Sequence, residues 1–194
     1  MNPYHPYAIF PLGDRGLVID FGNRIEEAVN KKVLQLYNHL KVRSHHWIMD
    51  FVPAYSSLTI YYDVYGVCQK KAEGKTAFET MADIVEDLIN GEGPTLEKQA
   101  RLIEVPVCYS EKFAVDIEYI SRQKNIHVEE IIHLHTSRTY RVFMIGFLPG
   151  FAYMGQVDER IAIPRKQQPQ NVVAGASGIA GSQTGIYPLD SPGG

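Results

Sequence analysis

The chain has 194 residues, of which 45% are hydrophobic and 21% charged, and its formal net charge is −3. This composition is ordinary for a globular protein that buries a sizeable core. An acidic balance without a block of like charges argues against a nucleic-acid-binding protein, which usually carries a basic face. No apolar run approaches the length of a membrane span, and the N-terminus lacks the pattern of a signal peptide.

The two cysteines, Cys68 and Cys108, lie far apart and form no C-x-x-C motif. Isolated cysteines of this kind are typical of small buried apolar residues in a reducing compartment. Together with the absence of signal-peptide and membrane patterns, they predict a cytoplasmic protein.

The N-terminal part predicts a small α+β sandwich in the order strand, strand, helix, strand, strand, helix. Residues 7–21 have the pattern of a hairpin, and a helix with an apolar stripe is expected to begin near Asn23. Residues 47–63 predict two further strands, which Pro53 separates. The last helix begins at Thr76, which forms a capping box with Glu79, and it ends at Asn90-Gly91.

A polar, turn-rich segment from residue 91 to residue 94 marks a domain boundary, so we expect domains at 1–92 and 98–194. The second domain is predicted to begin with a strand over 101–109, followed by helical segments at 115–124 and 128–135. After these, the sequence becomes strand-like and rich in glycine and proline, which indicates a β-barrel with helices packed outside.

Three patterns resemble enzyme or metal motifs and fail on inspection. Gly74-Lys75-Thr76 resembles the end of a phosphate-binding loop, but Gln69 stands where the first glycine is required. The segments 175–179 and 181–185 each miss the serine-hydrolase motif G-x-S-x-G by one residue. His133 and His135 would point to different faces of a helix, so we interpret them as surface or hydrogen-bonded structural histidines and predict no metal site.

The segment 146–155 contains three aromatic residues, three glycines and one proline, and 183–194 adds polar groups among turn residues. Glycine permits tight backbone, and aromatic rings supply rigid contact area. Such a loop forms either a wedge in the core or the lining of a cleft or partner interface. A nearby arginine suits a carboxylate or phosphate, or a surface salt bridge. The candidate substrate- or partner-binding residues are Pro149, Gly150, Phe151, Tyr153, Arg165, Gln183, Thr184 and Tyr187.

These motifs carry a family resemblance. The segments 140–155, 163–165, 180–188 and 191–194 resemble the allophanate hydrolase subunit 1 family, which includes the B subunit of 5-oxoprolinase and the Kip-type kinase inhibitors. Shorter matches at 52–58, 104–109 and 134–135 extend the resemblance over nearly the whole chain. One departure is Ser182, where the family pattern has a second glycine. The other is the end at Gly194, because family members usually continue for a few tens of residues.

The resemblance implies an α+β N-terminal domain followed by a cyclophilin-like β-barrel C-terminal domain, truncated at its C-terminal end. It implies the B subunit of an ATP-dependent 5-oxoprolinase, which acts with the A and C subunits to hydrolyse 5-oxoproline (pyroglutamate) to glutamate and is not active alone. ATP enters through the complex, and no residue receives a catalytic role. Two alternatives stay open: a Kip-type inhibitor that binds a sensor histidine kinase, and a component of a urea carboxylase or allophanate hydrolase.

Overall fold

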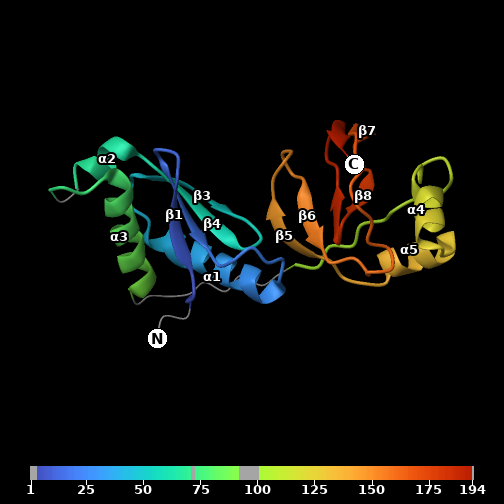
Figure 1. The fold of residues 1–194 in the computed structure, drawn as a ribbon, viewed down its shortest axis with the longest axis horizontal. Coiled ribbons are helices and arrows are strands. Elements are labelled where there is room, and N and C mark those ends of the chain that lie inside the picture. Colours follow the sequence, from blue (N-terminus) through green and yellow to red (C-terminus); the bar gives the residue numbers. More distant parts are fainter. Residues whose placement is uncertain (1–3, 71–72, 92–100, 194) are drawn as a thin grey trace. The chain divides into compact units, whose positions relative to one another are not determined.

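The computed structural model describes residues 4–70, 73–91 and 101–193. The chain divides into two compact units, Met1–Ala100 and Arg101–Gly194 (Figure 1). The predicted domain boundary between residues 92 and 98 lies outside the described residues.

The first unit contains a four-stranded antiparallel sheet in the order β1-β2-β4-β3. The predicted hairpin over 7–21 and the strand pair over 47–63 are confirmed. Alternate residues of the central strands point into the core, as expected for a sheet covered on one face. The strands are β1 (Ala8–Leu12), β2 (Gly16–Asp20), β3 (Ile48–Pro53) and β4 (Ser57–Tyr62).

Three helices, α1 (Glu27–Arg43), α2 (Val64–Cys68) and α3 (Ala77–Asn90), belong to the same unit (Figure 1). The apolar stripes of α1 and α3 meet the buried side chains of β2 and β4 in one continuous core. Burial of these side chains supplies most of the favourable free energy of the unit. The side chains at the centre of this core are Leu17, Ile19, Val33, Leu36, Leu40, Leu58, Ile60, Tyr62, Val67, Met81 and Val85.

The predicted start of α1 near Asn23 is wrong, because the helix begins at Glu27. Arg24 N donates to Gly22 O at 2.8 Å, which closes a three-residue turn around Asn23, and Glu26 is extended, with φ −125° and ψ 138°. Because neither conformation is helical, the helix starts only after Glu26. The N-cap residue, Glu26, makes no side-chain capping hydrogen bond.

The capping box of α3 is confirmed. Thr76 Oγ1 accepts a hydrogen bond from Glu79 N at 3.2 Å, and Glu79 Oε2 accepts from Thr76 N at 2.7 Å. Gly91 ends the helix as predicted, although its φ of −69° is not left-handed. The short helix α2 is not predicted from the sequence, although Asp63 caps it by accepting from two backbone N–H groups.

The second unit begins with residues that form no strand, so the strand predicted over 101–109 is wrong. Its two predicted helices are confirmed as α4 (Ile117–Lys124) and α5 (Val128–Thr136). Asn125, with φ +53°, ends α4 in the left-handed conformation. Side chains of α4 and α5 pack with Val157 and Ile161 in a core of their own.

The rest of the second unit is antiparallel sheet. One sheet has the order β5-β6-β9-β8, and a second contains β10 and β7. The described strands form no closed sheet, so the mixed α/β class with antiparallel sheets is confirmed and the cyclophilin-like barrel is not. The strands are β5 (Arg141–Ile145), β6 (Ala152–Gly155), β7 (Gln170–Val172), β8 (Ser177–Ala180), β9 (Gln183–Ile186) and β10 (Ser191–Gly193).

None of the helices in the described part of the chain is long and apolar enough to cross a membrane.

Thr76→Ala should lower the free energy of unfolding of the first unit by about 1 kcal/mol, because the N–H of Glu79 loses its acceptor. Trp47 is the only tryptophan in the chain and lies in this unit, so its fluorescence can follow urea unfolding. Thr76→Ser keeps the hydroxyl and serves as the control. Equal stability of the two variants would show that the cap contributes nothing.

Candidate functional site

The candidate site is built around the hairpin loop between β5 and β6. Residues 146–151 connect the paired residues Ile145 and Ala152. Phe151 N donates to Leu148 O at 3.0 Å, and Gly150 has φ +87°. Proline followed by a positive-φ glycine is the pattern of a type II turn, so Pro149 and Gly150 set the direction of the loop.

Phe147 has a backbone conformation that is rare for a residue with a side chain. Its φ is +64°, and Leu148 N donates to Gly146 O at 2.8 Å, which closes a three-residue γ-turn around it. Phe147 is 58% exposed, and its ring lies edge-on to Phe151, with the ring centroids 5.5 Å apart. The loop therefore holds a large apolar ring at its tip at a cost in backbone strain.

Behind this tip, the rings of Phe151, Tyr153 and Tyr187 form one cluster. Phe151 is 7% exposed, and its ring centroid lies 4.8 Å from that of Tyr153 and 5.1 Å from that of Tyr187. A Cβ atom built on Gly185 would lie 2.5 Å from Phe151 Cζ. The ring of Phe151 thus occupies the space that a side chain at 185 would fill, which makes it a core residue of the hairpin.

The two faces of strand β9 have different environments. Gly185 is paired with Tyr153 and lies under the aromatic cluster. Because successive residues of a strand point to opposite faces, the side chain of Thr184 lies on the other side of the sheet. There Thr184 is 4% exposed and is paired with Ile179, which packs against the core formed by α4 and α5.

On this second face, Thr184 belongs to a chain of hydrogen bonds through His135. Thr184 Oγ1 lies 3.0 Å from His135 Nε2, and His135 Nδ1 lies 2.6 Å from the hydroxyl of Tyr109. Thr184 Oγ1 also donates to the carbonyl of Gly178 at 3.0 Å. The chain therefore joins the segment before α4, the end of α5, and strands β8 and β9.

The carbonyl group at one end of this hydrogen-bond chain determines which groups donate along it. A carbonyl oxygen only accepts, so the single hydroxyl proton of Thr184 points to Gly178. Thr184 must then accept from His135, which places the proton of the neutral imidazole on Nε2. The opposite nitrogen, Nδ1, is left to accept from the hydroxyl of Tyr109. All hydrogen-bonding atoms of the imidazole are satisfied in this one tautomer.

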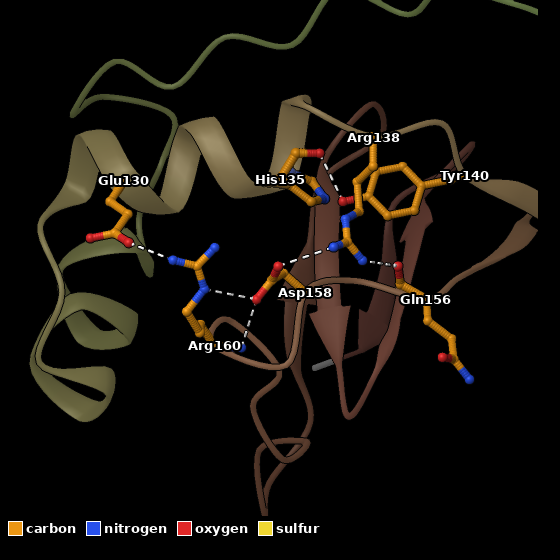
Figure 2. A network of polar contacts seen from close by, with 7 residues as sticks. All are labelled: Glu130, His135, Arg138, Tyr140, Gln156, Asp158 and Arg160. Carbon is orange, nitrogen blue, oxygen red and sulfur yellow. Dashed lines mark hydrogen bonds and ion pairs between the residues drawn. The ribbon is translucent and has the colours of Figure 1, made fainter.

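Burial shifts the pKa values of His135 and of the two tyrosines that contact it. It lowers the pKa of His135, because a charged imidazole would lose hydration. It raises the pKa of Tyr109, and it raises the pKa of Tyr140 to about 12. Tyr140 donates its hydroxyl to the backbone carbonyl of His135 at 2.8 Å (Figure 2). The neutral forms of all three side chains are therefore favoured.

An ion-pair network lies next to His135 (Figure 2). Asp158 accepts from Arg138 at 3.0 Å and from Arg160 at 3.1 Å, and Arg160 also pairs with Glu130 of α5 at 2.9 Å. The two arginines and the backbone hydrogen bond from Arg160 N lower the pKa of the Asp158 carboxyl. The network fastens α5 to the turn that follows β6. Because Arg138 and Arg160 are largely exposed, each pair contributes little alone.

The structure brings together some of the candidate residues predicted from the sequence. Pro149, Gly150 and Phe151 share the hairpin loop, with Tyr153 and Tyr187 in contact with Phe151. Gln183 and Thr184 are consecutive residues of β9, and their side chains lie on opposite faces of the sheet, with Thr184 facing away from the aromatic cluster. Arg165 is exposed and makes no hydrogen bond or ion pair with any residue that the structure describes, so no contact joins it to this group.

The sequence did not predict that His135 would contact Thr184, or that Tyr109 and Tyr140 would complete its environment. Of the two roles expected for His135, a surface histidine or a hydrogen-bonded structural histidine, the structure shows the second. Its partners lie 26 and 49 residues away along the chain, so no local pattern could reveal them.

The described residues contain no group of three or more His, Cys, Asp and Glu side chains that could hold a metal ion. The Gly74-Lys75-Thr76 segment also does not fit a nucleotide phosphate. Both the N–H and the hydroxyl of Thr76 donate to Glu79, and Lys75 pairs with Asp83. The donor groups that would bind a phosphate are therefore already paired with carboxylates.

The family described as "carboxyltransferase domain, subdomain C and D" matches residues 7–194, and the chain belongs to this family. The family resemblance recognised in the sequence is thereby confirmed.

Named relatives make the comparison more specific. The chain is 38% identical over 190 residues to the B subunit of 5-oxoprolinase from Bacillus subtilis (strain 168), covering 97% of this chain and 79% of that protein. It is 39% identical over 104 residues to the protein of the same name from Escherichia coli O157:H7, covering 53% of this chain and 48% of the relative.

Two solved structures have the same fold. The crystal structure of TTHA0988 matches 93% of this chain with a TM-score of 0.75 and 31% identity, and the chain spans 34% of that longer protein. The urea carboxylase of Kluyveromyces lactis matches 97% of this chain with a TM-score of 0.71 and 11% identity, over 18% of its own length. At that identity, the second likeness concerns the fold alone.

Gly185→Ala should destabilise the second unit by roughly 1–3 kcal/mol, because the added methyl group would overlap the ring of Phe151. Gly178→Ala is the matched control on the neighbouring strand. Its Cβ would lie 3.6 Å from Tyr187 Cε2, an ordinary contact, and we expect a change below about 1 kcal/mol. Chemical unfolding followed by circular dichroism measures both, and similar losses would contradict the close packing at Gly185.

The second unit should lose stability as the pH falls below about 6.5, the ordinary pKa of histidine. The pKa of His135 is lowered in the folded chain, so the unfolded chain binds the proton more readily. The stabilisation is complete above the unfolded pKa and disappears as the pH falls through the lower folded pKa. His135→Gln should flatten this dependence in urea unfolding, whereas His133→Gln, an exposed position on the same helix, should leave it as in the wild type.

Proposed function

We propose that this chain serves as the B subunit of an ATP-dependent 5-oxoprolinase. In this proposal it acts with the A and C subunits to hydrolyse 5-oxoproline to glutamate and has no activity alone. The observation that carries the proposal is the 38% identity to the B subunit of 5-oxoprolinase from Bacillus subtilis, which extends over 97% of this chain and 79% of that relative.

The reaction sets requirements that the second unit can help to meet. A lactam carbonyl is a poor electrophile, because the ring nitrogen donates electron density to it. Transfer of the γ-phosphoryl group of ATP to the carbonyl oxygen releases ADP and makes the carbon open to attack by water. The C–N bond of the ring then breaks, the ring nitrogen takes up a proton, and release of phosphate leaves the carboxylate of glutamate. Such a site needs cations for the phosphate, donors for the developing charge, and a closed apolar wall that excludes bulk water while admitting the one water molecule that attacks.

Within this chain, we assign the wall to the aromatic cluster, in which the buried Phe151 holds Tyr153 and Tyr187 in place. Gln183, on the same face of β9 as Gly185, is assigned as a donor. Arg165 has a guanidinium group that no described residue pairs, which suits a cation for a carboxylate or phosphate of the substrate. These roles are part of the proposal.

ATP is a substrate of the whole complex in this proposal. The one phosphate-loop-like segment of this chain is closed by Glu79, so no step that involves ATP is assigned to the residues of this chain. The A and C subunits are the partners that the reaction requires. The C subunit would be the direct partner.

Two further points belong to the proposal. The protein is placed in the cytoplasm, which the two free cysteines support. The sheets of the second unit are assigned to a cyclophilin-like barrel, which their antiparallel pairing supports.

The test uses the full chain, purified together with the C subunit and mixed with the A subunit. We expect ADP release and glutamate formation that depend both on 5-oxoproline and on this chain. Omission of this chain, with the other two subunits present, is the control. An Arg165→Ala complex with undiminished turnover would remove that residue from the proposal.

A stable complex with no turnover would contradict the enzyme assignment. Binding of the chain to a sensor histidine kinase would then become the function to test.

A further inference from the structure

His135 links the segment that precedes α4 to strand β9 through its two ring nitrogens. Its Nδ1 accepts from Tyr109, in the segment that precedes α4, and its Nε2 donates to Thr184, at the centre of β9. The hydroxyl of Thr184 continues the chain to Gly178 on the neighbouring strand. A single imidazole thereby joins β9 to α5 by a direct hydrogen bond.

Strand β9 presents its opposite face to the candidate site. Gln183 and Gly185 flank Thr184 and point away from His135. The ring of Phe151 rests on Gly185, and β9 leads within one residue to Tyr187. A displacement of Thr184 towards or away from α5 would therefore move the floor of the aromatic cluster and the amide of Gln183 together.

The contact is also hard to replace by water. Thr184 is 4% exposed, and both hydrogen-bonding functions of its hydroxyl are used by protein groups. If the imidazole donor is removed, a buried acceptor is left unsatisfied. The strand can recover that hydrogen bond only by shifting.

We propose that His135 is a positioning residue, which acts through Thr184 to hold the substrate-facing side of β9 in place. This inference rests on the proposed function, because it assigns the face of Gln183 and Gly185 to 5-oxoproline. His135 itself touches no substrate in this arrangement. The hydrogen bond between His135 Nδ1 and Tyr109 holds the segment that precedes α4 and does not position β9.

The two arms of the imidazole can be separated by substitution. His135→Gln places an amide N–H near the position of Nε2 and keeps the bond to Thr184. His135→Asn places an amide near the position of Nδ1 and keeps only the bond to Tyr109. Thr184→Val removes the hydroxyl at constant shape, Thr184→Ser keeps it, and Tyr109→Phe removes the other arm.

In the assembled complex, we expect His135→Asn and Thr184→Val each to raise KM for 5-oxoproline about tenfold, with kcat within about twofold of wild type. His135→Gln, Thr184→Ser and Tyr109→Phe should keep the wild-type KM. The double variant His135→Asn/Thr184→Val should be no worse than Thr184→Val alone, because that substitution already removes the contact with His135.

Hydrogen exchange of the β9 amides, Gln183–Ile186, in the full chain alone gives a readout that does not require turnover. His135→Asn and Thr184→Val should accelerate this exchange, and His135→Gln and Tyr109→Phe should not. If the wild-type complex has no turnover, the proposed function fails, and this exchange pattern still tests the positioning of β9. Equal KM or equal exchange for His135→Asn and His135→Gln would overturn the role of His135.

Discussion

The hydroxyl of Thr184 has one proton, which it donates in a hydrogen bond to the carbonyl of Gly178. Burial favours the neutral imidazole, and for that neutral form this constraint fixes the tautomer of His135 and the direction of the hydrogen bond from Tyr109. Because the contacts are partly or fully buried, they cannot be exchanged for water at low cost. Helix α5, strand β9 and the aromatic hairpin on the far side of the sheet are therefore held in one arrangement.

The features that the sequence predicted well are those that depend on neighbours in the chain. The capping box of Thr76 and Glu79 spans three residues, and the hairpin of β1 and β2 depends on a short turn. In both cases, residue type and spacing are enough to determine the local hydrogen bonds.

The features that it missed depend on contacts between distant residues. Residues 101–109 have strand-like side chains, but a strand also requires a partner, and the described strands provide none. The start of α1 differs from the prediction because the turn around Asn23 and the extended Glu26 precede the helix. His135 and Thr184 are 49 residues apart, so only the folded sheet brings them into contact.

Phe147 has a consequence for how stable this unit can be. Its backbone conformation is one that glycine adopts without strain, and a side chain there costs about 1–2 kcal/mol. Phe147 is 58% exposed, so burial offsets only part of that cost, and edge-on contacts with the rings of Phe151 and Tyr187 offset a further part. A glycine at this position would relieve the backbone strain and would lose both ring contacts. The strained backbone therefore keeps a partly exposed aromatic ring fixed against two others, which limits how stable the hairpin can become without changing its surface.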